Sequence, residues 1–147
     1  MTIRDALPSD LDAIEALEAE CFSLPWSRAT LESQLTGAGH VLIAAEENGA
    51  VAGYMGLQYV LNEGYITNVC TAADFRRRGA ARALISAMTA RAAELSLAFL
   101  TLEVRESNAA ARALYSSMGF GDIGKRPGYY EQPTENAIIM TLFLNEA

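Results

Sequence analysis

The run from Leu97 to Val104 constrains the fold of this chain most strongly. Only Thr101 and Glu103 interrupt its apolar side chains. Such a run is typical of a strand inside a sheet that is covered on both faces. A chain of 147 residues, 51% of them hydrophobic, is long enough to build this sheet and its covering helices. We therefore expect a single domain over residues 1–147.

The flanking segments alternate between strand and helix patterns. Further strands are expected over Thr2–Ala6, His40–Glu46, Val51–Leu61, Gly64–Thr71, Phe120–Lys125 and Ala137–Leu144. Helices are expected from Pro8 to about Phe22, from Ser27 to Gly37, from an arginine-rich loop to about Leu95, and from Ser107 to Met118. Ser9, Ser27 and Ser107 are the expected N-caps, and Gly119 the expected C′ residue. Asn48-Gly49 predicts a tight hairpin. This order predicts a mixed α/β sheet.

Composition limits the partners and the compartment. The net charge of −7 argues against broad nucleic-acid or membrane-surface binding and suits a cationic partner. Cys21 and Cys70 lie in apolar surroundings, and their spacing is not that of metal ligands. We expect Cys21 to be a core residue of its helix and Cys70 to be a small buried residue. With no signal peptide and no membrane-spanning run, a cytoplasmic protein with reduced thiols and no metal is expected.

The segment Thr67–Arg82 joins an expected strand to an expected helix. Its loop carries three arginines, Arg76–Arg78, followed by the small residues Gly79–Ala81. First-turn amides have no partner within a helix and lie at the positive end of its dipole, so such a loop is an anion site. We interpret it as the pyrophosphate site of a coenzyme. A solvated arginine turn is the alternative, and the phosphate-loop pattern of NTPases is absent.

Two sets of polar residues follow this loop. Glu103 is flanked by Leu102 and Val104, where apolar surroundings would raise the pKa of its carboxyl and suit a general base. The alternative is a simple ion pair with Arg105, which alternates onto the same face. Asn108, Arg112 and Tyr115 are spaced i, i+4 and i+7 on the next helix, so they share a face and could present an amide and a phenol to one ligand. A half-buried surface tyrosine is the alternative there.

Together these segments resemble the GCN5-related N-acetyltransferase (GNAT) family. Arg76, Gly79 and Ala81 occupy the marked positions of its (Q/R)-x-x-G-x-(G/A) signature, with Ala80-Ala81 replacing the commoner small-Gly ending. The more specific match is L-E-V-R-E-S-N-A-A-A-R-A-L-Y-S-S-M-G-F, which is similar to a segment of ribosomal-protein alanine N-acetyltransferases. F-S-L-P-W-S, the late G-Y-Y and N-A-I-I-M-T-L also fit that subgroup. The resemblance implies a mixed, mostly antiparallel sheet of about six or seven strands, flanked by four helices and splayed at its central strands.

The resemblance also implies a role for each matched residue, with acetyl-CoA as the donor. Glu103 would be the general base, acting through water, and Tyr115 the general acid that protonates the departing CoA thiolate. The residues expected to contact the pantetheine arm are Val69, Cys70 and Thr71, through their backbones, and Asn108. The residues expected at the pyrophosphate are Arg76, Arg77, Arg78, Gly79, Ala80, Ala81 and Arg82. The residues expected at the acceptor groove are Trp26, in the Leu24–Ser27 turn, and Tyr129 and Tyr130, in the loop Arg126–Pro133.

The chemistry of direct acetyl transfer favours an N-terminal acceptor. An α-amino group has a pKa near 8, against about 10.4 for lysine, so a glutamate removes its proton more easily. Together with this chemistry, the resemblance implies an N-terminal alanine acetyltransferase acting on small-subunit ribosomal protein 18. A covalent route through Cys70 is disfavoured, because the sole histidine, His40, lies at a distant strand start. A relative acetylating another protein or a small amine is the nearest alternative. Glu103 and Tyr115 together argue against a non-catalytic acyl-CoA sensor.

Overall fold

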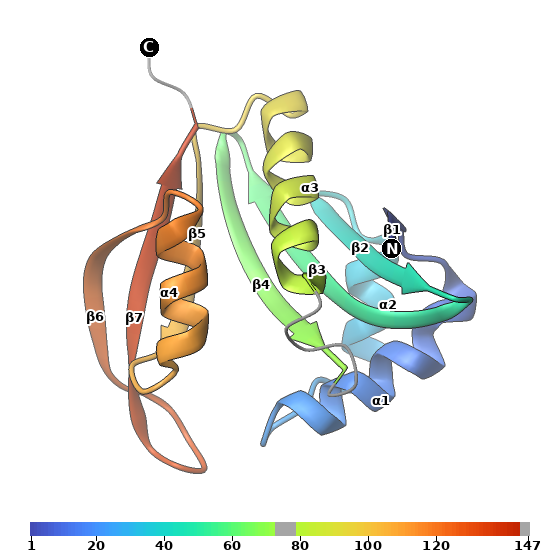
Figure 1. Cartoon of the computed structure of the whole chain (residues 1–147), viewed down its shortest axis with the longest axis horizontal. Coiled ribbons are helices and arrows are strands. Elements are labelled where there is room, and N and C mark those ends of the chain that lie inside the picture. Colours follow the sequence, from blue (N-terminus) through green and yellow to red (C-terminus); the bar gives the residue numbers. More distant parts are fainter. Residues whose placement is uncertain (73–78, 145–147) are drawn as a thin grey trace.

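The computed structural model describes residues 1–72 and 79–144, which form a seven-stranded sheet with four α-helices (Figure 1). The strands are β1 (Thr2–Asp5), β2 (His40–Glu47), β3 (Ala50–Val60), β4 (Glu63–Thr71), β5 (Phe99–Arg105), β6 (Gly121–Tyr130) and β7 (Glu135–Phe143). The helices are α1 (Leu11–Cys21), α2 (Arg28–Thr36), α3 (Ala80–Glu94) and α4 (Ala109–Ser117). The strand order is β1-β2-β3-β4-β5-β7-β6, and only the β4–β5 pair is parallel among these strands. The expected mixed, mostly antiparallel α/β fold is confirmed.

The helices cover the two faces of the sheet unequally. In Figure 1, α3 and α4 lie in front of the sheet, while α1 and α2 lie behind β2, β3 and β4. On β5, Leu100, Leu102 and Val104 are buried in the core shared with α3, but the residues between them are only half-buried. The prediction that this strand is covered on both faces is therefore wrong, because α1 and α2 pack on the other half of the sheet.

Local turn and cap signals succeed at three places. Asn48 and Gly49 both have positive φ, 53° and 81°, as a two-residue hairpin turn between β2 and β3 requires. Ser27 caps α2, since its hydroxyl accepts the Thr30 N–H at 3.2 Å. Gly119 follows α4 with a φ of 99°, the left-handed conformation that ends a helix. These signals act within four residues, so tertiary packing does not override them.

Two other expected caps are wrong, and in both cases the next residue takes the position. Ser9 lies inside the 3₁₀ turn Pro8–Asp10, and the Asp10 carboxylate accepts the Leu7 N–H at 2.7 Å. Asn108 rather than Ser107 caps α4. The Asn108 Oδ1 accepts the Ala111 N–H, whereas the Asp10 carboxylate makes no cap hydrogen bond to α1 and instead binds the Leu7 N–H and the Arg4 guanidinium.

The last hairpin differs from its predicted form. The first of its two strands, β6, continues to Tyr130, so Tyr129 and Tyr130 lie at the end of a strand rather than in a loop. The register with β7 is irregular between Arg126 and Tyr130, and Gly128 there has a φ of 63°. Glycine and proline within Gly121–Tyr130 suggest a loop from sequence, but pairing with β7 extends the strand through them.

Candidate active site

The central strands β4 and β5 are paired at one end only. Their parallel register covers the first three residues of each strand and ends at Tyr65↔Thr101. Beyond this point β4 continues to Thr71 and β5 to Arg105, and Figure 1 shows the two strands diverging. The expected splay at the centre of the sheet is confirmed.

A β-bulge at Thr67 redirects the free end of β4. Asn68 pairs with Gly56 and Ile66 with Leu57, so Thr67 is the extra residue between them. An extra residue reverses the face to which the following side chains point. Ile66 therefore packs in the core under α3, whereas Asn68 contacts α1 on the opposite face. Thr67 fits because position 56 is glycine, where a Cβ would lie 2.6 Å from the Thr67 hydroxyl.

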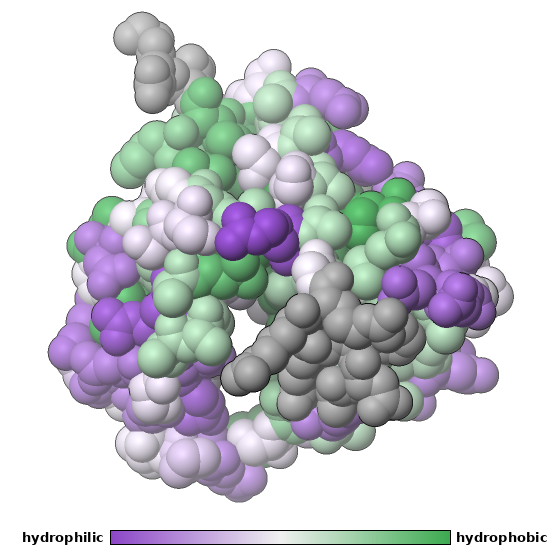
Figure 2. Space-filling view, in the orientation of Figure 1, coloured by the Kyte–Doolittle hydropathy of each residue, from purple (hydrophilic) through white to green (hydrophobic). Residues whose placement is uncertain are grey.

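The diverging strands open onto a cavity of about 1210 Å³. Figure 2 shows the molecule hollowed at this place, near the middle of the face seen in Figure 1. Its walls come from β4, β5, the first turns of α3 and α4, the segment after α1 and the end of β6. The predicted site residues that line it are Trp26, Val69, Cys70, Thr71, Gly79, Ala80, Ala81, Arg82, Glu103, Asn108, Tyr115, Tyr129 and Tyr130. Arg76, Arg77 and Arg78 lie outside the described residues.

One wall of the cavity is the unpaired edge of β4. Val69–Thr71 pairs with β3 on one side only, since β5 has diverged from the other. A strand edge of this kind exposes backbone N–H and C=O groups that can pair with an extended ligand. The Thr67 hydroxyl in the same wall is buried and has no hydrogen-bond partner within residues 1–72 and 79–144. A ligand with amide groups would satisfy the free backbone groups of this edge.

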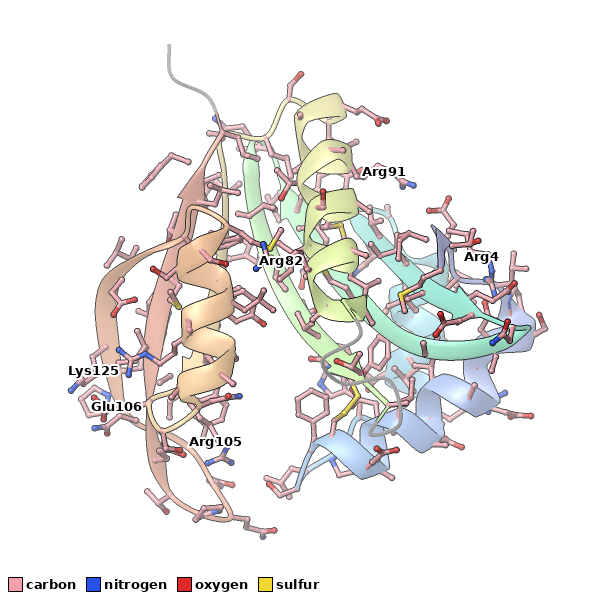
Figure 3. The ribbon with its side chains drawn as sticks, viewed as in Figure 1. Arg4, Arg82, Arg91, Arg105, Glu106 and Lys125 are labelled. Atoms are coloured by element: carbon pink, nitrogen blue, oxygen red, sulfur yellow. A yellow bond between two sulfur atoms is a disulfide. The ribbon has the colours of Figure 1, made fainter. Side chains whose placement is uncertain are left out.

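The N-terminus of α3 forms a second wall. Gly79 precedes it with a φ of 85° and contributes no side-chain cap, and a Cβ at this position would meet nothing within 4 Å. The first turn, Ala80–Arg82, lines the cavity and contains no acidic residue, so no carboxylate within this turn offsets the positive end of the helix dipole. Arg82 donates a hydrogen bond to Ser117 Oγ at 3.1 Å, between α3 and α4 (Figure 3). This end of α3 suits an anion.

Glu103 lies on the third wall, β5, on the face opposite Leu102 and Val104. Its carboxylate pairs with Arg126 at 3.3 Å. Arg105 instead pairs with Glu135 at 3.2 Å, so the alternative of a Glu103–Arg105 ion pair is wrong. The carboxylate is partly exposed to the cavity, which leaves it accessible to a water molecule or a substrate.

Tyr115 lies on α4 with only 7% of its surface exposed, and it borders the cavity. Its ring packs against Phe120 at a centroid distance of 5.7 Å. The alternative of a half-buried surface tyrosine is therefore wrong. Burial raises the pKa of the Tyr115 phenol to about 12, so the side chain is a proton donor at neutral pH.

The helix face predicted for Asn108, Arg112 and Tyr115 is only partly confirmed. Asn108 and Tyr115 line the cavity, and the Asn108 Oδ1 accepts the Ala111 N–H at 3.1 Å as the cap of α4. Arg112 points elsewhere and binds the Glu106 carbonyl at 2.9 Å. Arg112 lies within α4, but its long side chain reaches the Glu106 carbonyl and the Asp122 carboxylate instead of the cavity.

Aromatic residues border the open side of the cavity. Tyr129 and Tyr130 meet edge to face with centroids 5.0 Å apart, and the Arg105 guanidinium lies 4.5 Å from the Tyr130 centroid. Burial raises the pKa of both phenols. Trp26 lies on the segment after α1 and also lines the cavity. The three predicted acceptor-groove residues are thus brought to one cavity.

Glu18 and Asn68 were missed by the sequence motifs. Glu18 is 1% exposed and accepts hydrogen bonds from the Trp26 backbone N–H at 2.8 Å and from Asn68 Nδ2 at 2.5 Å. Burial raises the pKa of its carboxyl, while the two hydrogen bonds oppose that rise. A signal was available: Glu18 follows Ile14 by four residues and Leu11 by seven, which puts a carboxylate on the apolar face of α1.

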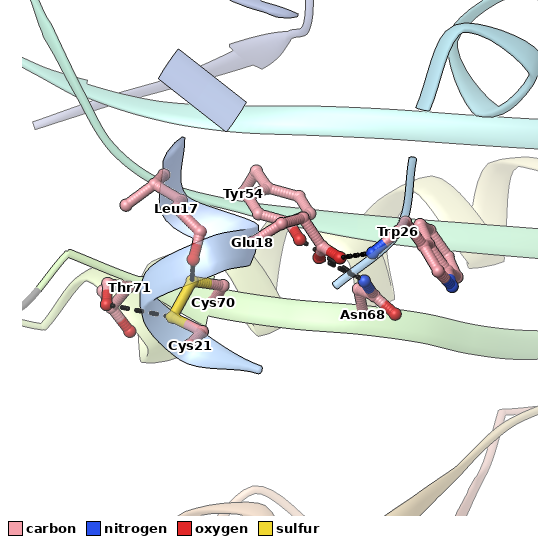
Figure 4. Close-up of a disulfide and its surroundings, with 8 residues drawn as sticks. All are labelled: Leu17, Glu18, Cys21, Trp26, Tyr54, Asn68, Cys70 and Thr71. Carbon is pink, nitrogen blue, oxygen red and sulfur yellow. Dashed lines mark hydrogen bonds between the residues drawn. A yellow bond between two sulfur atoms is a disulfide. The ribbon is translucent and has the colours of Figure 1, made fainter. Parts of the chain in front are cut away.

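Cys21 and Cys70 form a disulfide with an S–S distance of 1.98 Å (Figure 4). It links the last residue of α1 to β4, and the expectation of two reduced thiols is wrong. The bulge at Thr67 explains the pairing, because it turns Cys70 toward α1 together with Asn68. A sulfur held in a disulfide is not a nucleophile, which agrees with the prediction against a covalent route through Cys70.

The described part of the chain holds neither a metal-binding cluster nor a membrane-spanning helix. Residues 1–72 and 79–144 contain no group of three or more His, Cys, Asp or Glu side chains placed to hold a metal ion. Within the same ranges, no helix has the length and apolar character needed to cross a membrane.

Comparison with known proteins places the chain in a family. Residues 11–120 match the model of the acetyltransferase (GNAT) family. The [ribosomal protein bS18]-alanine N-acetyltransferase of Escherichia coli K12 is 37% identical over 145 residues, covering 96% of each chain. The crystal structure of the E. coli ribosomal-protein-S18-alanine N-acetyltransferase superposes with a TM-score of 0.92 at 36% identity, covering 99% of this chain and 95% of that one. Arabidopsis thaliana NAA60 in complex with acetyl-CoA shares the fold, with a TM-score of 0.89 at 20% identity over 98% of each chain. The chain therefore belongs to the GNAT family of acetyltransferases.

Proposed function

We propose that this protein transfers the acetyl group of acetyl-CoA to the α-amino group of an N-terminal alanine, on a ribosomal protein of the bS18 kind. The observation that carries the proposal is the cavity between β4 and β5, where Glu103 and Tyr115 border a free strand edge. The E. coli relative that is similar along nearly the whole chain is named for this reaction. A ribosomal substrate would be met in the cytoplasm, the compartment that we propose.

Acetyl-CoA fits two walls of the cavity. The free edge of β4 at Val69–Thr71 would pair with the amides of the pantetheine arm, and the uncapped turn Gly79–Arg82 would hold the pyrophosphate. The three arginines Arg76–Arg78 precede this turn in sequence and would add positive charge near the phosphates. Asn108 uses Oδ1 as a helix cap, so its Nδ2 is the atom left to donate to a pantetheine carbonyl. Acetyl-CoA supplies the thioester whose sulfur is the leaving group.

Glu103 would receive the proton of the acceptor amine through a water molecule. An α-amino group with a pKa near 8 loses its proton more readily than lysine at about 10.4, by about 3 kcal/mol. The same carboxylate therefore serves an N-terminus better than a lysine side chain. Arg126, at 3.3 Å, holds the carboxylate in place from β6.

Tyr115 would give a proton to the thiolate that leaves. Its phenol has a pKa of about 12, so it carries its proton at every physiological pH. A protein thiol has a reference pKa near 8.5, below that of the buried phenol, so Tyr115 would stabilise the departing thiolate by donating a hydrogen bond to it. Full proton transfer becomes favourable only when burial raises the pKa of the departing thiol as well. The position of Tyr115 on the cavity wall, across from β4, suits this role.

The open side of the cavity would receive the peptide. Trp26 borders it from the segment after α1, and Tyr129 and Tyr130 border it from β6. Aromatic walls suit an extended backbone, whereas the net charge of −7 favours a basic partner such as a ribosomal protein.

The test is turnover with acetyl-CoA on three acceptors: a peptide that begins with alanine, a blocked peptide whose only amines are lysines, and a polyamine. We expect the alanine peptide to have the highest kcat/KM. A preference for the polyamine would overturn the proposed substrate. Binding of acetyl-CoA without turnover of any acceptor would favour a sensor.

A further inference from the structure

We propose that Asn68 binds the acceptor amine through its side-chain oxygen, Oδ1, and that Glu18 is a positioning residue that keeps this oxygen turned toward the cavity. The proposal rests on acetyl transfer to a primary amine, the function proposed above. It gives a role to two residues outside the sequence motifs. Its basis is the hydrogen bonding of one buried carboxylate and one cavity-lining amide (Figure 4).

Glu18 is a buried carboxylate held without a cation. It is 1% exposed, and within the described residues its partners are two N–H donors and no arginine, lysine or histidine. One oxygen accepts the Trp26 backbone N–H at 2.8 Å and the other accepts Asn68 Nδ2 at 2.5 Å. Both partners line the cavity. A buried charge of this kind is unfavourable when no cation compensates it, so its placement calls for an explanation.

The carboxylate fixes which way the Asn68 amide faces. A carboxylate only accepts hydrogen bonds, so the NH₂ end of the amide must point at Glu18. The same nitrogen lies 3.3 Å from the Tyr54 hydroxyl, which is also buried. The Asn68 oxygen therefore points away from Glu18 and Tyr54, as Figure 4 shows, and no described residue donates to it.

The bulge places this oxygen on the same face of the sheet as Glu103. Asn68 points to the α1 face of β4 because Thr67 is the extra residue. Glu103 points to the face of β5 opposite Leu102 and Val104, which pack in the α3 core. Both residues line the cavity where the two strands have diverged. A group bound between the strands on that face would have a carboxylate on one side and an amide oxygen on the other.

A neutral primary amine fits between these two acceptors. It has two N–H bonds and one lone pair, and attack requires the lone pair to face the thioester carbon. One N–H would donate through water to Glu103, and the other to Asn68 Oδ1. As the C–N bond forms and the C–S bond breaks, the amine proton passes toward Glu103 and the thiolate takes its proton from Tyr115. Asn68 would thus orient the nucleophile without accepting its proton.

The substitution Glu18→Gln tests the positioning role. Glutamine has nearly the same shape, but it brings an NH₂ group where Glu18 presents an oxygen. When the oxygen of the new glutamine accepts the Trp26 N–H, its NH₂ group faces Asn68. The Asn68 amide must then turn its own oxygen toward the glutamine, and an NH₂ group faces the amine. We expect kcat/KM for the acceptor to fall by roughly 10–100-fold, because the amine loses its hydrogen bond to the Asn68 oxygen and meets an NH₂ group instead. Affinity for acetyl-CoA, measured by calorimetry, should change less than about two-fold, a change within the spread of such measurements.

The double substitution Glu18→Gln/Asn68→Asp is the rescue. The negative charge then lies at position 68 instead of position 18. The NH₂ group of the new glutamine donates to one oxygen of the new aspartate, and the other aspartate oxygen faces the cavity. We expect the double substitution to recover most of the lost kcat/KM. The matched control is Asn68→Leu, which removes the oxygen; adding Glu18→Gln to it should lower kcat/KM no further, because the two residues act through one atom.

The readouts separate positioning from mere folding. Thermal unfolding and circular dichroism of every variant report the folded fraction, and acetyl-CoA binding reports the coenzyme wall. The kcat/KM values of the variants are measured with the acceptor that the wild-type protein acetylates, chosen from the alanine peptide, the lysine peptide and the polyamine. The role of Asn68 is therefore tested even if the preferred acceptor is not the alanine peptide. An unchanged kcat/KM in Glu18→Gln or Asn68→Leu would overturn it. A folded, coenzyme-binding Glu18→Gln/Asn68→Asp protein as slow as Glu18→Gln would do the same.

Discussion

The Glu103 carboxylate lies 3.3 Å from the guanidinium of Arg126, which is on β6, two strands away in the sheet order. Arg126 is 57% exposed, so this ion pair contributes at most about 1 kcal/mol to stability. Its consequence is positional: the carboxylate is held at the cavity while remaining open to it. Arg105, two residues along the same strand, instead pairs with Glu135 and supports the Tyr130 ring.

Removing the charge of Glu103 should remove the base. We predict that Glu103→Gln lowers kcat by roughly 10²–10⁴-fold and leaves the affinity for acetyl-CoA largely unchanged, because the shape of the side chain is kept. Steady-state kinetics with a coenzyme-binding measurement check this. Arg126→Gln is the matched control, and its kcat should fall far less. A near-normal kcat in Glu103→Gln would remove Glu103 from the mechanism.

Removing the hydroxyl of Tyr115 should remove the acid. We predict that Tyr115→Phe lowers kcat by roughly 10²–10⁴-fold while acetyl-CoA binding persists, since the ring still packs against Phe120. A thiol-release assay follows the reaction directly. The acid assignment fails if the variant turns over at the wild-type rate.

Tyr115 also gives the protein a stability that depends on pH. The pKa of its phenol is raised by burial to about 12, above the unfolded value of 10, so the stabilisation is complete below pH 10 and is lost as the pH rises toward 12. The two-unit difference corresponds to on the order of 3 kcal/mol. Urea unfolding at pH 8, 10 and 11 should therefore show a steeper loss for the wild type than for Tyr115→Phe. Equal slopes would mean that the phenol is not buried in solution.

The disulfide should stabilise the fold through the unfolded chain. Cys21 and Cys70 are 49 residues apart, and closing a loop of that length corresponds to about 4 kcal/mol in the chain-entropy model. Reduction should lower the free energy of unfolding by up to that amount. It should not unfold the protein, because the Leu17 and Thr71 carbonyls lie 3.3 and 3.6 Å from the sulfurs and can accept the two thiol protons (Figure 4).

The matched control for reduction is the double variant Cys21→Ala/Cys70→Ala. Its free energy of unfolding should not respond to a thiol reductant, whereas that of the oxidised wild type should fall. The prediction is wrong if the two proteins respond alike, or if the purified wild type shows two free thiols by mass-labelling.

Much of the fold and most of the site follow from local sequence. Asn48-Gly49 predicts its hairpin because both φ angles are set within the turn, and the motif around Glu103 and Tyr115 predicts residues that meet in one cavity. The Cys21–Cys70 pairing does not follow, since it depends on the packing of α1 against β4, two elements far apart in sequence. The role of Glu18 could not be predicted for a similar reason, because its carboxylate meets Asn68 only when α1 packs on β4.

The most direct test uses one peptide that carries both an N-terminal alanine and an internal lysine. After incubation with acetyl-CoA and the wild-type protein, fragmentation mass spectrometry locates the acetyl group. The proposed function predicts acetylation of the α-amino group of alanine, with the lysine unmodified at low conversion. Acetylation of the lysine first, or of neither amine by a protein that binds acetyl-CoA, would contradict it.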